Sequence, residues 1–217
     1  KGARIVVRPV SAPVAQRKNK RRRLPQGIGD IGMSEAVGFI GLGLMGAGFC
    51  KRLLASGRKV VGFDLDPARR SEAQALGVEI VASPAEVARR TRLIGIAVTT
   101  TKAVDAVVSG ADGVLGAASA GTIVIDFSTT EIAVTKKLAA ALAAKGIAFI
   151  DAPVSGGPPA AEAGTLAIMA GGTKEAIEAA GALAECLGLF THMGDVGAGQ
   201  ATKLVNQALC LTNYCIV

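Results

Sequence analysis

The fold is decided by AVGFIGLGLMG, residues 36–46, together with the segment that follows it. Its first five residues form a short apolar run typical of a buried strand, and a helix-like pattern continues from the glycines to about residue 56. Three glycines in a G-x-G-x-x-G pattern would permit a tight turn, a close approach of phosphate and close helix–strand packing. This strand–turn–helix predicts a dinucleotide-binding turn whose helix start holds a diphosphate. The predicted cofactor-binding residues here are Gly41, Leu42, Gly43, Leu44, Met45 and Gly46.

An acidic residue follows the next apolar run. Asp64 ends the run 59–63 and lies 23 residues after Gly41. A carboxylate at this place can accept hydrogen bonds from the adenosine ribose and would repel the 2′-phosphate of NADP, so we predict NAD as the cofactor. Arg69 and Arg70 keep NADP open, since a nearby arginine can accommodate that phosphate. We interpret both as surface residues of the following helix.

Apolar runs and helix-like segments alternate along most of the remaining chain. This alternation predicts βαβ units and an α/β fold, a Rossmann-like doubly wound and mostly parallel sheet. The last helix, 199–217, shows no capping or helix-breaking residue at its end, and we expect sequence to be missing downstream. Strands are expected at 36–40, 59–63, 78–81, 93–98, 122–126, 147–150, 164–172 and 187–191, and helices near 44–56, 67–76, 84–90, 102–108, 131–144, 174–185 and 199–217.

The positive charge of the chain is concentrated in a leader, residues 1–34. Residues 1–32 carry nine basic groups and one acid, whereas the other 185 residues carry 15 basic and 16 acidic groups. A basic, proline-punctuated stretch of this kind is expected to stay disordered. Three interpretations are open: a tail that binds nucleic acid or directs nuclear import, a transit peptide, or upstream sequence before Met33.

Composition excludes several classes of protein. Half of the residues are hydrophobic, which excludes general disorder, and no apolar run is long enough to span a membrane, so we expect a soluble protein. The four cysteines lack a C-x-x-C pair, and we interpret them as buried thiols, with no metal site. His192 is interpreted as a hydrogen-bonded loop residue, and Asp126 and Asp151 as capping and turn residues after strands.

Four segments in this order resemble the β-hydroxyacid dehydrogenase family, which includes 3-hydroxyisobutyrate dehydrogenase, tartronate semialdehyde reductase and 6-phosphogluconate dehydrogenase. The first is FIGLGLMG at 39–46, and the second is DFSTT at 126–130. The third is DAPVSGG at 151–157, which Gly-Thr-Leu follows at 164–166. The fourth is GAG at 197–199 with its lysine at 203. The resemblance spans residues 36–217 and implies an NAD-binding domain at 35–197, with 198–217 beginning the interdomain helix of a truncated, all-helical second domain.

The resemblance also implies roles for individual residues. Lys203 would be the catalytic general acid/base, which handles the hydroxyl proton while a hydride moves between the substrate carbon and the nicotinamide. Ser155 would bind the substrate carboxylate, with help from the N–H groups of Gly156 and Gly157. Burial and the positive nicotinamide ring should lower the pKa of Lys203.

This chain departs from the family pattern near the lysine. The family commonly has Asn four residues after it, where this chain has Gln207, and Asn206 comes just before; both are predicted to contact substrate. Arg52 replaces an Asn of the first helix. Four hydroxyl residues after strands are expected to line the cofactor: Thr99, Thr100, Ser128 and Thr129.

The predicted function is an NAD-dependent oxidoreductase that interconverts a short 3-hydroxy acid and its semialdehyde. When full length it should form a homo-oligomer, with no membrane partner, in the cytoplasm, or in mitochondria if the leader is a transit peptide. The alternative is a non-catalytic nucleic-acid-associated protein with a dehydrogenase-like module and a basic tail. Without a second domain, the apolar residues Leu204, Leu211 and Tyr214 would be exposed, and we expect instability or self-association.

Overall fold

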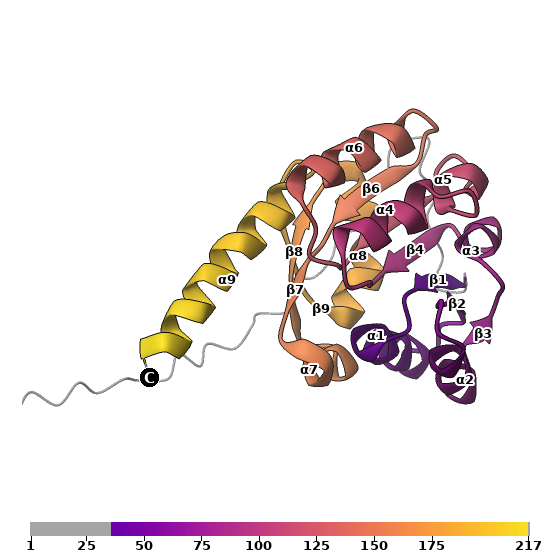
Figure 1. Ribbon diagram of the computed structural model, residues 1–217, viewed down its shortest axis with the longest axis horizontal. Coiled ribbons are helices and arrows are strands. Elements are labelled where there is room, and N and C mark those ends of the chain that lie inside the picture. The colour runs from indigo at the N-terminus through magenta and orange to yellow at the C-terminus, as the bar shows by residue number, and fades with distance from the viewer. Residues whose placement is uncertain (1–35, 217) are drawn as a thin grey trace, which may run out of the picture.

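The computed structural model describes residues 36–216 and shows one mixed sheet between two layers of helices (Figure 1). The basic leader and its three interpretations lie outside the described residues. The strand order is β3-β2-β1-β4-β5-β6-β8-β7, and β9 pairs with β8. Strands β1 to β6 are parallel to one another, and the order reverses between β1 and β4. The strands are β1 (Val37–Ile40), β2 (Val60–Phe63), β3 (Glu79–Ile80), β4 (Leu93–Ile96), β5 (Ile123–Asp126), β6 (Ala148–Asp151), β7 (Val154–Ser155), β8 (Leu166–Gly171) and β9 (Gly188–Gly194).

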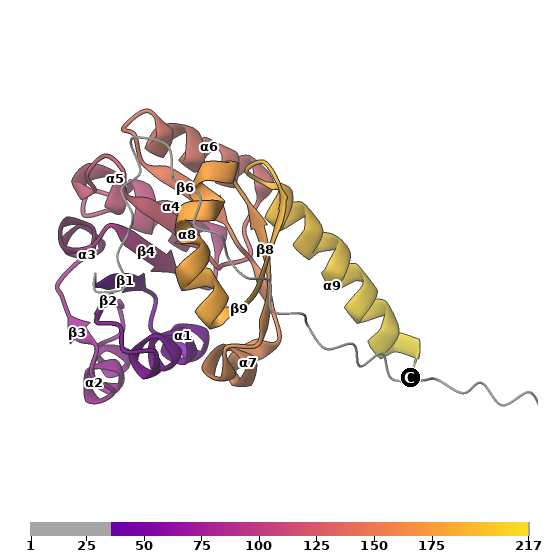
Figure 2. The same ribbon diagram turned by 180° about the vertical axis from the view of Figure 1, so that it is seen from behind.

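Helices cover both faces of this sheet, which is why the central strands are buried apolar runs without alternation. On one face α3, α4 and α6 pack a core around Val87, Val104 and Leu138. On the opposite face α1 and α8 contribute Phe49 and Leu183 to a second core, and Figure 2 shows α8 in front of the sheet. The helices are α1 (Leu44–Ala55), α2 (Pro67–Ala75), α3 (Pro84–Arg90), α4 (Thr101–Ser109), α5 (Val114–Ala117), α6 (Ile132–Ala143), α7 (Gly157–Ala163), α8 (Lys174–Leu187) and α9 (Ala198–Ile216).

The predicted Rossmann-like, mostly parallel sheet is confirmed for β1 to β6, and the structure adds elements after β6. Here β8 runs antiparallel to both β6 and β7. Helix α7 was not predicted, because its sequence GPPAAEA resembles a turn. Proline is favourable in the first turn of a helix, where its missing N–H has no intrahelical partner, and the two prolines stand there. The short helix α5 and strand β7 were also missed.

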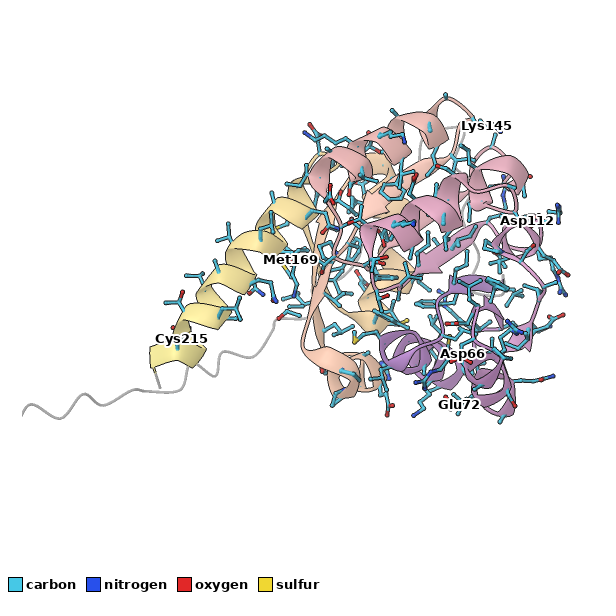
Figure 3. All side chains as sticks on the ribbon, viewed as in Figure 1. Asp66, Glu72, Asp112, Lys145, Met169 and Cys215 are labelled. Carbon is cyan, nitrogen blue, oxygen red and sulfur yellow. The ribbon has the colours of Figure 1, made fainter. Side chains whose placement is uncertain are left out.

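Strand β9 is longer than predicted and includes His192, so the loop interpretation of this residue is wrong. Its Nε2 lies 3.0 Å from the carbonyl oxygen of Gly172 and 2.9 Å from that of Gly194, which confirms a hydrogen-bonded histidine. The four cysteines are free thiols, but only Cys50 is buried. Cys215, at the far end of α9, is exposed, so the prediction of buried thiols is wrong there (Figure 3).

Helix α9 begins against the sheet and then extends away from it (Figure 1). Leu204, Val205, Leu209 and Leu211 are each about 60% exposed, which confirms the expected exposure of Leu204 and Leu211. The side chain of Tyr214 lies outside the described part of the chain. None of the helices within residues 36–216 is long and apolar enough to cross a membrane.

Candidate functional site

A cleft of about 890 Å³ lies at the carboxyl ends of the parallel strands, beside the place where the strand order reverses. Ligands of open α/β sheets bind at this position. Its walls come from the start of α1, the ends of β2, β4 and β5, the β7–α7 turn, and α9. The residues that line it are Gly43, Leu44, Met45, Phe49, Asp64, Asp66, Arg69, Ala97, Val98, Thr99, Phe127, Ser128, Thr129, Val154, Ser155, Gly156, Gly157, Lys203, Gln207, Cys210 and Leu211.

The three glycines of the predicted turn have different surroundings. Gly41 has φ +91°, which disfavours other residues, and an added Cβ would overlap the carbonyl oxygen of Ala97. A Cβ on Gly46 would overlap the carbonyl oxygen of Gly41. Gly43 lines the cleft and a Cβ there would meet nothing within 4 Å. Two glycines therefore shape the turn, and the third leaves its backbone open to the cleft.

The start of α1 is suited to an anion. Gly43 is the N-cap, with no side chain that caps the helix and no acidic residue in the first turn. The first N–H groups of a helix have no intrahelical acceptor and carry the positive end of the helix dipole. An open glycine backbone beside such N–H groups fits the diphosphate of a dinucleotide.

Asp64 follows β2 and lines the cleft, as predicted for a ribose-binding carboxylate. Its Oδ2 accepts a 2.6 Å hydrogen bond from the N–H of Leu42, and Oδ1 accepts a 2.9 Å bond from the N–H of Asp66. The side chain is therefore fixed by the glycine turn. A carboxylate has about four acceptor positions, so acceptor capacity remains for ribose hydroxyls.

The two arginines near Asp64 are placed differently. Arg70 donates from Nη1 to the carbonyl oxygens of Asp64 and Leu65, at 2.6 and 3.1 Å. Arg69 lines the cleft and forms a 2.9 Å ion pair with Glu72. The interpretation as mere surface residues therefore overlooked Arg69, which reaches the cleft wall.

Lys203 faces the cleft from the second turn of α9, and only 8% of the residue is exposed. Its Nζ donates to the carbonyl oxygen of Val154 and to Oε1 of Gln207, both at 2.8 Å. Burial lowers the pKa of this amine below the ordinary lysine value, and the nearby Cys210 opposes this to a smaller extent. An ammonium has three N–H donors, so one remains for a ligand.

The β7–α7 turn forms the wall beside Lys203. Val154 and Ser155 pair with Ile168 and Ala167 of β8, which holds the turn at the edge of the sheet. Gly156 and Gly157 follow with φ of +131° and +72°, a backbone path that requires glycine. All three residues predicted to bind a carboxylate, at 155–157, line the cleft.

The remaining predicted site residues divide into two groups. Thr99, Ser128 and Thr129 line the cleft, and the Ser128 hydroxyl accepts a 3.0 Å hydrogen bond from the N–H of Val98. Thr100 lies outside the lining and caps α4, where its hydroxyl accepts from the N–H of Ala103. Asn206 also lies outside the lining, and its Nδ2 is buried without a partner among the described residues.

Sequence reasoning missed several residues of the cleft wall. Phe127 and Phe49 stack with ring centroids 4.6 Å apart and form its apolar floor. Cys210 and Leu211 extend the wall along α9. They follow Lys203 by seven and eight residues, a spacing that places them on its helical face, so helical periodicity could have identified them.

Two buried carboxylates lie behind the cleft, at the ends of β5 and β6. Asp126 accepts hydrogen bonds from the N–H of Ser128 and the hydroxyl of Thr130, and burial raises its pKa to about 7. Those bonds lower the pKa, and the neighbouring Asp151 raises it further. Burial also raises the pKa of Asp151, which caps the start of α9, as the capping interpretation predicted. Within residues 36–216 no cluster of three or more His, Cys, Asp or Glu could hold a metal ion.

A family model described as the NAD binding domain of 6-phosphogluconate dehydrogenase matches residues 36–196. The chain is 42% identical over 175 residues to human mitochondrial 3-hydroxyisobutyrate dehydrogenase. The aligned segment covers 80% of this chain and 52% of the human protein. It is 40% identical to 2-(hydroxymethyl)glutarate dehydrogenase of Eubacterium barkeri, with 80% and 58% covered. The chain thus spans about half the length of the curated relatives it matches.

Solved structures show the same architecture. A Mycobacterium tuberculosis 3-hydroxyisobutyrate dehydrogenase with L-serine is 34% identical, with a TM-score of 0.77 over 82% of this chain and 60% of that one. Psf3 in complex with NADP+ and 2-OPP is 32% identical, with a TM-score of 0.75 and 78% and 61% covered. An imine reductase from Myxococcus stipitatus, 20% identical, shares the fold, with a TM-score of 0.76 over 84% of this chain and 64% of that one.

Proposed function

This chain belongs to the β-hydroxyacid dehydrogenase family and carries its NAD-binding domain, and from this premise we propose that it is part of an NAD-dependent 3-hydroxyacid dehydrogenase. The substrate class is a short 3-hydroxy acid and its semialdehyde. Relatives named for 3-hydroxyisobutyrate and 2-(hydroxymethyl)glutarate, both hydroxy acids, support this class. A homo-oligomeric state remains a prediction.

The observation that carries the proposal is a buried lysine amine in the same cleft as an open glycine turn. Lys203, the β7–α7 turn and the start of α1 all line this cleft. A nicotinamide coenzyme bound there supplies hydride chemistry. Buried lysines are uncommon unless their charge is compensated, and an amine with a lowered pKa is suited to proton transfer near neutral pH.

Each wall of the cleft would perform a separate task. Lys203 takes the hydroxyl proton of the substrate during oxidation and returns it during reduction, while Gln207 and the carbonyl oxygen of Val154 hold its Nζ in place. The Ser155 hydroxyl and the N–H groups of Gly156 and Gly157 bind the substrate carboxylate, since a glycine turn can expose N–H donors to an anion. Gln207 and Asn206 stay proposed substrate contacts, although Asn206 does not line the cleft.

For the cofactor we propose a preference for NAD over NADP. Asp64 would accept bonds from both ribose hydroxyls and repel a 2′-phosphate. Arg69 on the same wall, and a relative that binds NADP+, are the reasons to measure both cofactors. Relatives are named mitochondrial, which favours the transit-peptide interpretation of the leader; a cytoplasmic location remains the alternative.

The test is turnover by the full-length protein with 3-hydroxyisobutyrate, glycerate, 4-hydroxybutyrate and serine. Lys203→Ala should reduce kcat roughly 10²–10⁴-fold, the usual contribution of a general acid/base, and leave the Kd for NADH unchanged. Lys137→Ala is the matched control, because Lys137 is an exposed lysine on α6. Turnover that survives Lys203→Ala, or wild-type chain that turns over none of these acids, would contradict the proposal.

A further inference from the structure

The start of α9 is attached to the sheet by buried polar contacts. Asp151, fully buried at the end of β6, accepts hydrogen bonds from the N–H groups of Gly197 and Gln200 at 2.7 and 2.9 Å. The negative carboxylate meets the positive end of the helix dipole, which stabilises the helix start. The first turn of α9 is therefore fixed to β6.

Glycine brings this helix start directly against the strands. A Cβ on Gly199 would overlap the carbonyl oxygens of Met169 and Asp151, and a Cβ on Gly171 would lie 2.8 Å from the nitrogen of Gly199. No side chain separates the first turn of α9 from the backbones of β6 and β8. A displacement of these strands would move the helix start with them.

The side chain of Gln200 adds a second attachment, to the segment after β5. Its Nε2 donates to the carbonyl oxygen of Ser128 at 2.9 Å, and its Oε1 accepts from the N–H of Thr130 at 3.0 Å. Only 1% of Gln200 is exposed. Ser128 in turn lines the cleft and accepts from the N–H of Val98 after β4. One network thus connects α9 with the ends of β4, β5 and β6.

Lys203 lies three residues after Gln200, within one helical turn. Beyond this turn, α9 presents exposed leucines and a valine, and in the described part of the chain they find little apolar packing. We propose that Asp151 and Gln200 are positioning residues that place the Lys203 amine in the cleft by fixing the first turn of α9 to the ends of β5 and β6. Neither lines the cleft. This inference rests on the proposed function of Lys203 and extends it to residues that touch neither substrate nor cofactor.

The experiment measures Lys203 itself and needs no turnover. Acetic anhydride labels free amines, and mass spectrometry of the full chain across a pH series gives the midpoint at which the Lys203 amine deprotonates. In Gln200→Met, which has similar length and cannot make either amide bond, we expect this midpoint to move up toward the ordinary lysine value. NADH binding should be retained, and at most weakened through Ser128, because the hydrogen bonds of Gln200 do not involve the start of α1.

A second neutral variant and a control separate position from general stability. Gln200→Leu also loses both amide bonds and adds no charge, and the same upward shift of the midpoint is expected. Leu142→Ala removes a fully buried side chain of α6 at the far side of the sheet and should lower stability with no shift at Lys203.

A folded Gln200→Met chain with an unmoved Lys203 midpoint would overturn the inference. So would the loss of folding in both Gln200 variants, because the contacts would then support the sheet and not the lysine. The proposed function fails by a different result, retained turnover in Lys203→Ala, so the two failures are distinguishable.

Discussion

Helices α1 and α9 both begin at the cleft, and their first turns are satisfied in opposite ways. The start of α1 has a glycine N-cap, no capping side chain and an open backbone. The start of α9 is capped by the buried carboxylate of Asp151 and tied down by Gln200. A helix start that the protein leaves free can bind an anion, whereas one that holds its own carboxylate serves as an attachment point. The two helices therefore differ in whether their first N–H groups are free: those of α1 can bind a ligand, and those of α9 fix the helix to the sheet.

The largest effect is expected from a substitution that disrupts the turn before α1. In Gly46→Ala the new Cβ overlaps the backbone oxygen of Gly41, which cannot move without opening the turn. We expect a loss of about 3–5 kcal/mol in the free energy of unfolding, the upper range for point substitutions, and weak NADH binding. Urea unfolding and NADH fluorescence measure both. Wild-type stability in this variant would show that the turn is not shaped by close packing.

The second prediction concerns the carboxylates near the α9 attachment. Asp126 is fully buried with a pKa of about 7, against an ordinary value of 3.8, so the folded state retains a proton that the unfolded chain loses. Stability should therefore fall as pH rises from about 4 to about 7 and level off above that window. Asp126→Asn, which stays neutral, should remove this fall and stabilise the protein at pH 8 by on the order of 2–4 kcal/mol.

Urea unfolding at pH 4, 6 and 8 measures this difference. Asp151, whose pKa is also raised, is present in both proteins, so the difference between the two profiles reports Asp126 together with its coupling to Asp151. Parallel stability profiles of Asp126→Asn and wild type would contradict the prediction.

The smallest change in stability is expected at Gly43, and it tests most directly whether the open start of α1 binds the diphosphate. Gly43→Ala adds a methyl group at an open position with φ −64°, which alanine adopts freely. Stability should fall by about 0.5–1 kcal/mol, because alanine is a poorer N-cap than glycine, whereas NADH affinity should fall about tenfold because the methyl group occupies the approach of the diphosphate. Gly181→Ala, an equally open glycine in α8, is the control and should leave NADH affinity unchanged. Equal NADH affinities in wild type, Gly43→Ala and Gly181→Ala would show that the diphosphate does not bind at Gly43.

The two regions also differ in how far sequence could predict them. The turn before α1 is local, because its strand, glycines and helix lie within twenty residues, and Asp64 follows one unit later. The attachment of α9 depends on Asp151 and Gln200, which are 49 residues apart. The sequence predicted a capping role for Asp151 after its strand, but it did not predict that Asp151 caps α9. No periodicity marks Gln200, since its amide acts through backbone groups of the β5–α6 connection.

Between these extremes, the β7–α7 region shows where local rules mislead. Ser155 and the two glycines were predicted to bind substrate and do line the cleft, yet the helix after them was missed because Pro158 and Pro159 resemble a loop. The antiparallel direction of β8 was missed as well, because the apolar run of a strand does not encode its direction.

The attachment of α9 through its first turn has a mechanical consequence. With a rise of about 1.5 Å per residue, Lys203 lies roughly 8 Å from the first residue of the helix and Leu211 roughly 20 Å. A pivot of α9 about its fixed base would therefore displace the outer wall at Cys210 and Leu211 more than twice as far as the amine. In such a pivot the outer wall of the cleft would move while Lys203, the proposed proton-transfer group, would stay almost stationary.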